Sequence, residues 1–174
     1  MQAGGDYHVT TLTDYGETVN LVNAMTYSDN IYFAREALKI GADTMEEKLK
    51  SFGFEEELPF DLTMQASTFD DDGKIDSEIQ LADTGYGQGQ VLVNPLHLLS
   101  MYSMFVNDGN MIQPVLKYEE NAAAKIWKEQ AVSAQTAQTV KQSLLSVIEN
   151  PSGTGASAKI DGVTMLGKNR NCRD

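Results

Sequence analysis

Apolar residues recur at helical spacing in the first quarter of the chain. Between residues 20 and 40 they follow a period of about 3.6 residues that is interrupted around Ser28, and Gly41 suits a left-handed position after a helix. The pattern therefore predicts two consecutive helices. The apolar positions that carry it are Leu21, Met25, Ile31, Ala34 and Leu38.

A third helix is predicted by a start signal. Thr44 and Glu47 match the capping box, in which the two side chains accept hydrogen bonds from otherwise unpaired backbone N–H groups. Gly53 suits the end of the same element. Together these residues predict a short helix over 45–52.

Two more helices are predicted in the second half of the chain. Asn94 is a good capping residue, and Pro95 after it suits the first helical position, so a helix is expected to begin there and to end before Gly109. Residues 133–149 form another amphipathic pattern, which Asn150 and the following proline end.

The remaining segments predict extended or irregular structure. Alternating residues at 7–13 indicate a short strand or an extended arm, and short strands are expected at 114–118 and 125–128 and as an extended pair within 156–166. Residues 54–90 are rich in Asp, Gly, Ser and Thr, and a stretch of this length usually borders a functional site or wraps a core.

Composition and charge narrow the class of protein. The chain has 174 residues, 41% of them hydrophobic, which predicts a folded domain with its own core. The net charge of −12 argues against nucleic acid or an anionic membrane as a partner, because both require clustered Lys and Arg. A single cysteine, Cys172, excludes an internal disulfide framework. No transmembrane run or signal peptide is evident, so this chain alone is expected to carry neither a signal nor an anchor.

The acidic stretch from Asp70 to Asp76 resembles a calcium loop only at first sight. An EF-hand loop has glycine at its sixth position and a bidentate glutamate at its twelfth. With Gly73 at position six, the first ligand is Thr68 and the twelfth is Ile79. An acidic surface turn is the favoured interpretation, and a calcium-binding loop protein is kept as a third functional hypothesis.

Glycines and histidines suggest no cofactor or metal site. The run from Gly85 to Gly89 would need glycine at residue 90 to match the dinucleotide fingerprint, and Gln90 stands there. These glycines are expected to adopt positive φ before the Asn94 helix. His8 and His97 have no ligands at metal-binding spacing, and His97 is expected to be a buried or half-buried histidine with satisfied hydrogen bonds.

The tripeptide Ser28-Asp29-Asn30 has two interpretations. Its three residue types cap helices, because their side-chain oxygens accept from the first free N–H groups, and on the tripeptide alone capping is favoured. The same letters form the S-D-N motif that accompanies S-x-x-K and K-T-G in penicillin-binding proteins and class A β-lactamases.

Longer blocks favour the second interpretation. SDNIYFAREALKIGA, beginning at Ser28, and LADTGYGQGQVLVNPLHLLSMYSMFVNDGNMIQPVL, over 81–116, resemble the transpeptidase domain of class B high-molecular-weight penicillin-binding proteins. The resemblance is to the low-affinity group of the methicillin-resistance type, and it runs from about Asp6 to Lys168.

The resemblance implies an α+β fold in which helices cover both sides of a five-stranded antiparallel sheet and a helical lobe stands beside it. This chain is expected to hold a partial version, mainly the helical lobe and the beginning of the sheet. The expected parts of this incomplete domain are an arm at 1–13, the helical lobe at 14–112, strands and a helix leading to the Lys-Thr-Gly strand at 113–168, and an aberrant tail at 169–174.

The resemblance also implies acyl transfer in peptidoglycan crosslinking. In the family a serine attacks the D-Ala-D-Ala bond of a stem peptide, an amine of a second strand resolves the acyl-enzyme, and β-lactams trap the same serine. Ser28, Asn30 and Lys168 would be catalytic: Ser28 would relay a proton, Asn30 would donate its amide to the substrate, and Lys168 would help to hold the substrate carboxylate. No cofactor is implied. The full-length parent would bind stem peptides and β-lactams outside the cytoplasmic membrane, to which it would be anchored.

Two departures from the family pattern decide what this chain is expected to do. No Ser-x-x-Lys lies between Met1 and Ser28, so we expect the chain to begin after the nucleophilic serine and to be inactive toward penicillin. Its alternative function is a non-catalytic module that binds stem peptide or a partner in the cell wall or divisome. Self-association through an exposed sheet edge is a further expectation.

The second departure follows Lys168, where the family has Lys-Thr/Ser-Gly-Thr-Ala-Glu and this chain has Asn169, Arg170 and four more residues. The codons AAA AAC CGG AAC TGC AGA GAY would encode 168–174, and loss of one A gives AAA ACC GGA ACT GCA GAG, which encodes Lys-Thr-Gly-Thr-Ala-Glu. A frameshift is the leading hypothesis, and a vector-derived tail is the rival. Arg170 in place of the glycine would fill the substrate groove.

Overall fold

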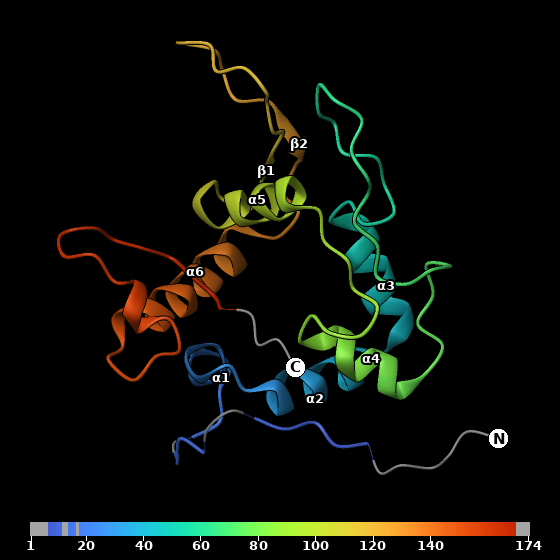
Figure 1. Cartoon of the computed structure of the whole chain (residues 1–174), viewed down its shortest axis with the longest axis vertical. Coiled ribbons are helices and arrows are strands. Elements are labelled where there is room, and N and C mark those ends of the chain that lie inside the picture. The colour runs from blue at the N-terminus through green and yellow to red at the C-terminus, as the bar shows by residue number, and fades with distance from the viewer. Residues whose placement is uncertain (1–6, 12–13, 17, 170–174) are drawn as a thin grey trace. The chain divides into compact units, whose positions relative to one another are not determined.

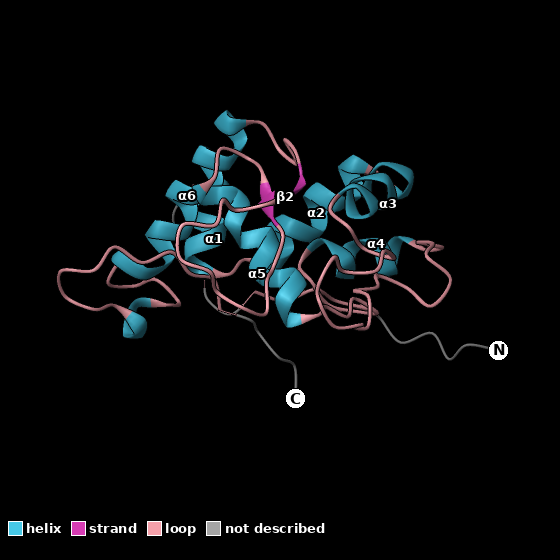
Figure 2. Ribbon diagram, turned by 90° about the horizontal axis from the view of Figure 1, so that it is seen from above, coloured by secondary structure: helices cyan, strands magenta, loops and turns pink. Residues whose placement is uncertain are grey.

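The computed structural model describes residues 7–11, 14–16 and 18–169, which form two compact units. The first unit takes the described residues of 1–42, 76–89 and 143–174, and the second takes 43–75 and 90–142. Helices supply most of the regular structure, and the strands form one short antiparallel hairpin (Figure 2). The expected α+β class is confirmed. Within the described ranges no helix is long and apolar enough to cross a bilayer.

The first unit begins with the two consecutive helices that the apolar spacing predicts (Figure 1). Helix α1 (Leu21–Tyr27) starts after Asn20, whose side chain accepts from the N–H of Asn23. Helix α2 (Asn30–Ile40) starts after Asp29, whose side chain accepts from Tyr32 at 3.1 Å. The prediction that Ser28-Asp29-Asn30 caps a helix is therefore confirmed for Asp29, whereas Ser28 ends α1.

Helix α4 (Glu78–Gly85) was not predicted, and it packs against α2. Ser77 caps it by accepting from the N–H of Gln80. A Cβ added at Gly85 would lie 2.6 Å from Ala37 Cβ and 2.8 Å from Phe33 O, so only glycine permits this close approach. Buried Leu81 lies on α4, and buried Ala37 belongs to α2.

Helix α6 (Ala134–Glu149) matches its prediction closely. Its last turns belong to the first unit, where Leu144, Val147 and Ile148 are buried. A 3-10 turn, η2 (Ala156–Ala158), follows, and residues 159–169 contain no strand. The extended strand pair predicted within 156–166 is therefore wrong, because this segment has no ladder partner among the described residues.

In the second unit, helix α3 (Ala42–Ser51) begins directly after Gly41, which has φ 85° and ψ 157°. Gly41 has a positive φ and ends α2, but the left-handed position expected for it is wrong, because this ψ lies outside the left-handed helical well. The capping box at Thr44 and Glu47 is wrong, because α3 starts before Thr44 and places it inside the helix. Gly53, which was expected at the end of this element, has φ 98°.

Helix α5 (Pro95–Ser103) has the predicted cap, since the Asn94 side chain accepts from the N–H of Leu96 at 2.9 Å. The 3-10 turn η1 (Met104–Val106) continues it. Strand β1 (Met111–Ile112) lies beside α5 and pairs antiparallel with β2 (Ile126–Lys128) (Figure 1). The second strand was predicted, but the strand at 114–118 is wrong, because pairing ends before Pro114, which has no N–H to donate.

His97 is buried in the second unit, with 1% of its surface exposed. Its Nε2 lies 2.8 Å from the carbonyl oxygen of Phe52, and its Nδ1 lies 2.7 Å from Ser67 Oγ. Because a carbonyl only accepts, Nε2 carries the proton and Nδ1 accepts from the serine. The expectation of a satisfied buried histidine is confirmed. Burial lowers its pKa below the usual 6.5, although the bond to Phe52 opposes that shift.

Several other predictions can be compared with the structure. Gly87 and Gly89 have positive φ, as expected, but the expectation is wrong for Gly85, which is the last residue of α4. The predicted acidic surface turn is confirmed, since the N–H of Asp72 bonds Asp70 Oδ1 and the N–H of Lys74 bonds Asp72 Oδ1.

The described part of the N-terminal arm contains no strand. Residues 1–6 and 12–13 of that arm lie outside the described residues, as do Arg170, Cys172 and the rest of the tail at 170–174.

Candidate active site

Ser28 occupies an unusual backbone conformation between α1 and α2. Its φ of 56° and ψ of 51° lie in the left-handed region, which non-glycine residues seldom adopt and which recurs at functional sites. Its N–H bonds the carbonyls of Ala24 and Met25 at the end of α1. This turn leaves Ser28 only 2% exposed.

The Ser28 hydroxyl meets three side chains from distant parts of the sequence. Lys168 Nζ donates to Ser28 Oγ at 2.5 Å, Ser28 donates to Asn169 Oδ1 at 3.0 Å, and Ser28 shares a 2.9 Å hydrogen bond with Thr154 Oγ1. We call Ser28, Thr154, Lys168 and Asn169 the Ser28 cluster. A hydroxyl that receives a proton from an amine and passes its own to a neighbour has the geometry of a proton relay.

The backbone before Lys168 is held close to α6. The Gly167 N–H bonds the carbonyl of Leu144 at 3.4 Å, and a Cβ on Gly167 would lie 2.7 Å from Ile148 Cδ1. The glycine therefore lets this segment lie on the helix, from which Lys168 reaches the cluster. Lys168 Nζ also donates to the Asn169 carbonyl at 3.0 Å and to Asn169 Oδ1 at 3.3 Å. Burial lowers the pKa of Lys168 below its usual 10.5, because desolvation disfavours the ammonium ion.

Thr154 is a cluster residue that the sequence did not reveal. Its N–H and its hydroxyl both bond the carbonyl of Thr26, at 3.0 and 3.1 Å, and the Thr26 hydroxyl bonds Ser146 Oγ at 2.8 Å. Gly153 before it has no room for a Cβ, which would lie 2.4 Å from the carbonyl oxygen of Val147. The available signal was the short Gly-Thr-Gly run after the α6 pattern, where such small residues indicate a close backbone approach.

Asp29 and Asn30 have different surroundings from Ser28. Asp29 is 6% exposed, and its Oδ2 accepts from Tyr15 OH at 2.8 Å, so it holds the turn. Asn30 is the first residue of α2, and its Nδ2 donates to the carbonyl of Thr10 at 3.1 Å. The structure gives the two side chains separate partners, and the role of Asn30 stays a prediction.

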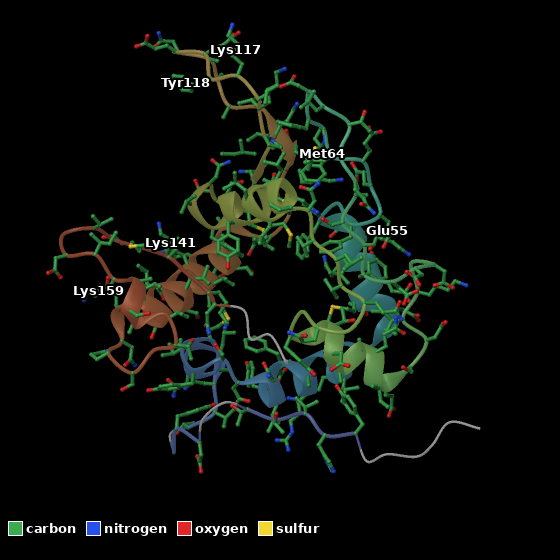
Figure 3. All side chains as sticks on the ribbon, in the orientation of Figure 1. Glu55, Met64, Lys117, Tyr118, Lys141 and Lys159 are labelled. Carbon is green, nitrogen blue, oxygen red and sulfur yellow. The ribbon has the colours of Figure 1, made fainter. Side chains whose placement is uncertain are left out.

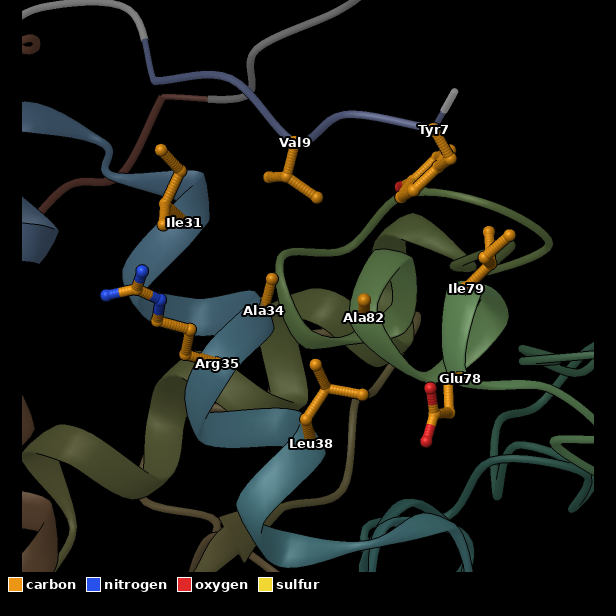
Figure 4. A pocket seen from close by; sticks show the side chains of 9 residues that line it. All are labelled: Tyr7, Val9, Ile31, Ala34, Arg35, Leu38, Glu78, Ile79 and Ala82. Atoms are coloured by element: carbon orange, nitrogen blue, oxygen red, sulfur yellow. The ribbon is translucent and has the colours of Figure 1, made fainter. Parts of the chain in front are cut away.

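A cavity of about 280 Å³ lies elsewhere in the first unit, with mostly apolar walls (Figure 4). None of its lining residues belongs to the Ser28 cluster, so it is a separate feature. Within the described ranges no three His, Cys, Asp or Glu side chains gather in a way that would hold a metal ion. The cavity is lined by Tyr7, Val9, Ile31, Ala34, Arg35, Leu38, Glu78, Ile79 and Ala82.

Comparisons with known proteins identify the class. The family model for the penicillin binding protein transpeptidase domain matches residues 1–169, and the chain belongs to this family. Penicillin-binding protein 3 of Bacillus subtilis is 42% identical over 164 residues, which are 94% of this chain and 24% of that relative. The chain thus spans about a quarter of the length of the curated relatives that it matches.

Solved structures agree on the fold. A peptidoglycan glycosyltransferase from Burkholderia ambifaria matches 92% of this chain and 49% of its own, with a TM-score of 0.77 and 23% identity. Penicillin-binding protein A from M. tuberculosis, solved as a ceftriaxone acyl-enzyme complex, matches 86% of this chain and 34% of its own, with a TM-score of 0.69 and 23% identity. The expected partial transpeptidase fold is therefore confirmed.

Proposed function

We propose that this chain is the part of a D,D-transpeptidase domain that carries its second active-site motif and the lysine of its third, and that the parent protein crosslinks peptidoglycan by acyl transfer. The observation that carries the proposal is the 2.5 Å hydrogen bond from Lys168 Nζ to Ser28 Oγ. It joins the Ser-x-Asn element to the lysine of the Lys-Thr-Gly position across 140 residues of sequence. Membership of the transpeptidase family supports the same assignment.

In this proposal Ser28 and Lys168 move the proton of acyl transfer. When the nucleophilic serine attacks the D-Ala-D-Ala bond, the departing amine needs a proton. Ser28 supplies it and takes another from Lys168, whose lowered pKa eases that transfer. The short bond between the two groups keeps the relay in place before substrate arrives.

Asn30 orients the substrate in the proposed mechanism. A carboxamide nitrogen carries two N–H donors, and the bond to the carbonyl of Thr10 uses one of them. The second N–H is the donor that we assign to a backbone carbonyl of the stem peptide. Lys168 adds positive charge near the carboxylate of the same peptide.

We place the nucleophile in the parent protein, because no Ser-x-x-Lys lies between Met1 and Ser28. Fluorescent penicillin is expected to label the parent and not this chain alone. Covalent labelling of the isolated chain would show that the nucleophile has been misplaced. A parent that neither binds penicillin nor crosslinks stem peptides would overturn the proposed function.

The finer parts of the assignment are proposals too. We place the parent outside the cytoplasmic membrane, anchored there, and in the low-affinity group of the methicillin-resistance type. The slow acylation that marks such a group is measured directly as the rate of β-lactam labelling of the parent. Labelling as fast as that of β-lactam-sensitive penicillin-binding proteins would remove it from that group.

We also propose that the reading frame changes after the codon of Lys168. The support is the one-base relation between the codons of this tail and Lys-Thr-Gly-Thr-Ala-Glu. Resequencing the gene across the codons for Gly167 to Asp174 tests the proposal. An uninterrupted frame that encodes Asn-Arg-Asn-Cys-Arg, with no Lys-Thr-Gly frame beside it, would end it.

A further inference from the structure

The side-chain oxygen of Asn169 is the shared acceptor of the Ser28 cluster. Asn169 Oδ1 lies 2.7 Å from Thr154 Oγ1, 3.0 Å from Ser28 Oγ and 3.3 Å from Lys168 Nζ, and each of these three groups donates to it. Two hydroxyl groups and one ammonium group therefore converge on a single oxygen atom. Such a set of donors suits a carboxylate oxygen better than a neutral amide oxygen, because charge-assisted hydrogen bonds are roughly twice as strong.

We propose that Asn169 acts as an internal ligand of this site: its amide oxygen occupies the position in which Ser28, Thr154 and Lys168 bind a carboxylate oxygen of a peptide C-terminus. The inference rests on the proposed function for the nature of the peptide. It goes further in assigning Thr154 to the carboxylate subsite and in making Asn169 a competitor of the substrate. The chain then holds its own binding site closed.

The geometry around the cluster supports this assignment. Ser28 is 2% exposed, and the backbone of Thr154 is fixed by the hydrogen bond from its N–H to the carbonyl of Thr26 at 3.0 Å, so the backbone holds two of the three donors in place. Among the described residues no carboxylate lies within ion-pair distance of Lys168 Nζ. The site thus holds a cation whose nearest acceptors are neutral oxygens, which is an arrangement that favours an incoming anion.

The competition predicts how binding changes when Asn169 is replaced. When the open form of a site is only a few per cent populated, the apparent dissociation constant of its ligand is the intrinsic constant divided by that fraction, so binding is weaker. Asn169→Gly removes the internal oxygen, and Asn169→Thr shortens the side chain and restores the residue type of the family motif. Both variants of the 174-residue chain are expected to bind N-acetyl-D-Ala-D-Ala at least about tenfold more tightly than the wild-type chain.

Two controls separate carboxylate recognition from general loosening of the site. The peptide amide N-acetyl-D-Ala-D-Ala-NH2 is expected to bind Asn169→Gly no better than it binds the wild-type chain. Adding Thr154→Val to Asn169→Gly is expected to reverse most of the gain, because one of the three donors is lost. Isothermal titration and the amide shifts of residues next to Ser28 report both effects.

A second measurement needs no peptide. Asn169→Asp places a carboxylate on the same three donors, so this variant is expected to melt at a higher temperature than the wild-type chain at pH 7, by about 3 °C. The donors lower the pKa of the new carboxyl group, so the gain is present above its unfolded pKa and is lost as the pH falls through the folded value. Destabilisation at pH 7 would show that the site is not built for an anion.

The outcomes distinguish this inference from the proposed function. Equal peptide binding by the wild-type chain and Asn169→Gly, equal binding of the acid and the amide, or no binding by Asn169→Gly each overturns the inference. The first of these leaves the proposed function standing, because the site would still take the peptide. An acylation rate of the parent that stays unchanged when Ser28 or Lys168 is replaced would overturn the proposed function and leave the carboxylate site in place.

Discussion

Lys168 Nζ donates a 2.5 Å hydrogen bond to Ser28 Oγ, although 140 positions of sequence separate the two residues. The left-handed turn at Ser28 and the close passage of Gly167 over α6 bring the two groups together. The backbone at Ser28 and at Gly167 is held by these contacts. We therefore expect the hydrogen bond between Lys168 and Ser28 to survive substitutions of surface residues and to be lost when the supporting contacts are removed.

Thr154→Val is expected to weaken the cluster. Valine keeps the shape of threonine but lacks the hydroxyl, which lies 2.7 Å from Asn169 Oδ1 and 3.1 Å from the carbonyl oxygen of Thr26 and has one proton to donate. The free energy of unfolding should fall by about 1–2 kcal/mol, measured by urea denaturation. Thr139→Val on the exposed side of α6 is the matched control and should change the same quantity by less than about 0.5 kcal/mol. A loss in the control as large as that of Thr154→Val would refute the special role of Thr154.

Gly85→Ala is expected to destabilise the first unit even though it replaces glycine within a helix. At an unconstrained helical site this change stabilises by roughly 0.5–1 kcal/mol. Here the new methyl group would lie 2.6 Å from Ala37 Cβ and 2.8 Å from the carbonyl oxygen of Phe33, so overpacking should cost about 1–3 kcal/mol. The free energy of unfolding of Gly85→Ala is expected to be lower than that of the wild-type chain. A higher value would contradict the close packing of α4 on α2.

His97 is expected to make stability depend on pH. Its pKa in the folded chain lies below the unfolded value of 6.5, chiefly through burial, so the unfolded state binds the proton more readily. Stability should therefore fall as the pH drops through about 6.5 and should level off below the folded pKa. Unfolding midpoints at pH 7.5 and pH 5 measure this difference. The difference between the two midpoints should be smaller in His97→Gln. An equal difference in the variant and the wild-type chain would rule out His97 as the source of the pH dependence.

The hairpin of the second unit is expected to promote self-association. A two-stranded sheet has an outer edge on each strand. The loop that connects the strands carries Tyr118 (Figure 3), and 61% of Leu116 and 82% of Tyr118 are exposed. Replacing both residues by lysine should lower the mass measured by light scattering at high concentration. Glu120→Lys on the same loop is the control, because it changes charge and keeps the apolar side chains. A wild-type chain that stays monomeric at high concentration would contradict the expectation.

Local sequence signals predicted the elements that depend on local chemistry. The capping residue Asn94 and the following proline set the start of α5, and the apolar spacing of α6 set its length. Local signals failed where neighbouring structure overrides them. The capping box at Thr44 does not start a helix, because α3 begins at Ala42, directly after Gly41. Helix α4 was missed because it has only 8 residues and depends on packing against α2.

The candidate site was predictable only in part. Ser28 and Lys168 carry motifs, so the resemblance to the transpeptidase family could select them. Thr154 lies 126 positions from Ser28, and no periodic pattern encodes a contact over that distance. The hydrogen bond from Asn30 to the carbonyl of Thr10 depends likewise on how the N-terminal segment folds back, which propensity alone does not specify.

The most direct test of the central claim is a double-mutant cycle in the parent protein, where we place the nucleophile. Ser28→Ala and Lys168→Met are each expected to slow acylation by fluorescent penicillin about 100-fold or more, since both remove the same proton relay. The double variant should be no slower than the slower single variant, because residues that act as one unit are not additive. Acylation at the wild-type rate in either single variant, or fully additive losses in the double variant, would contradict the account.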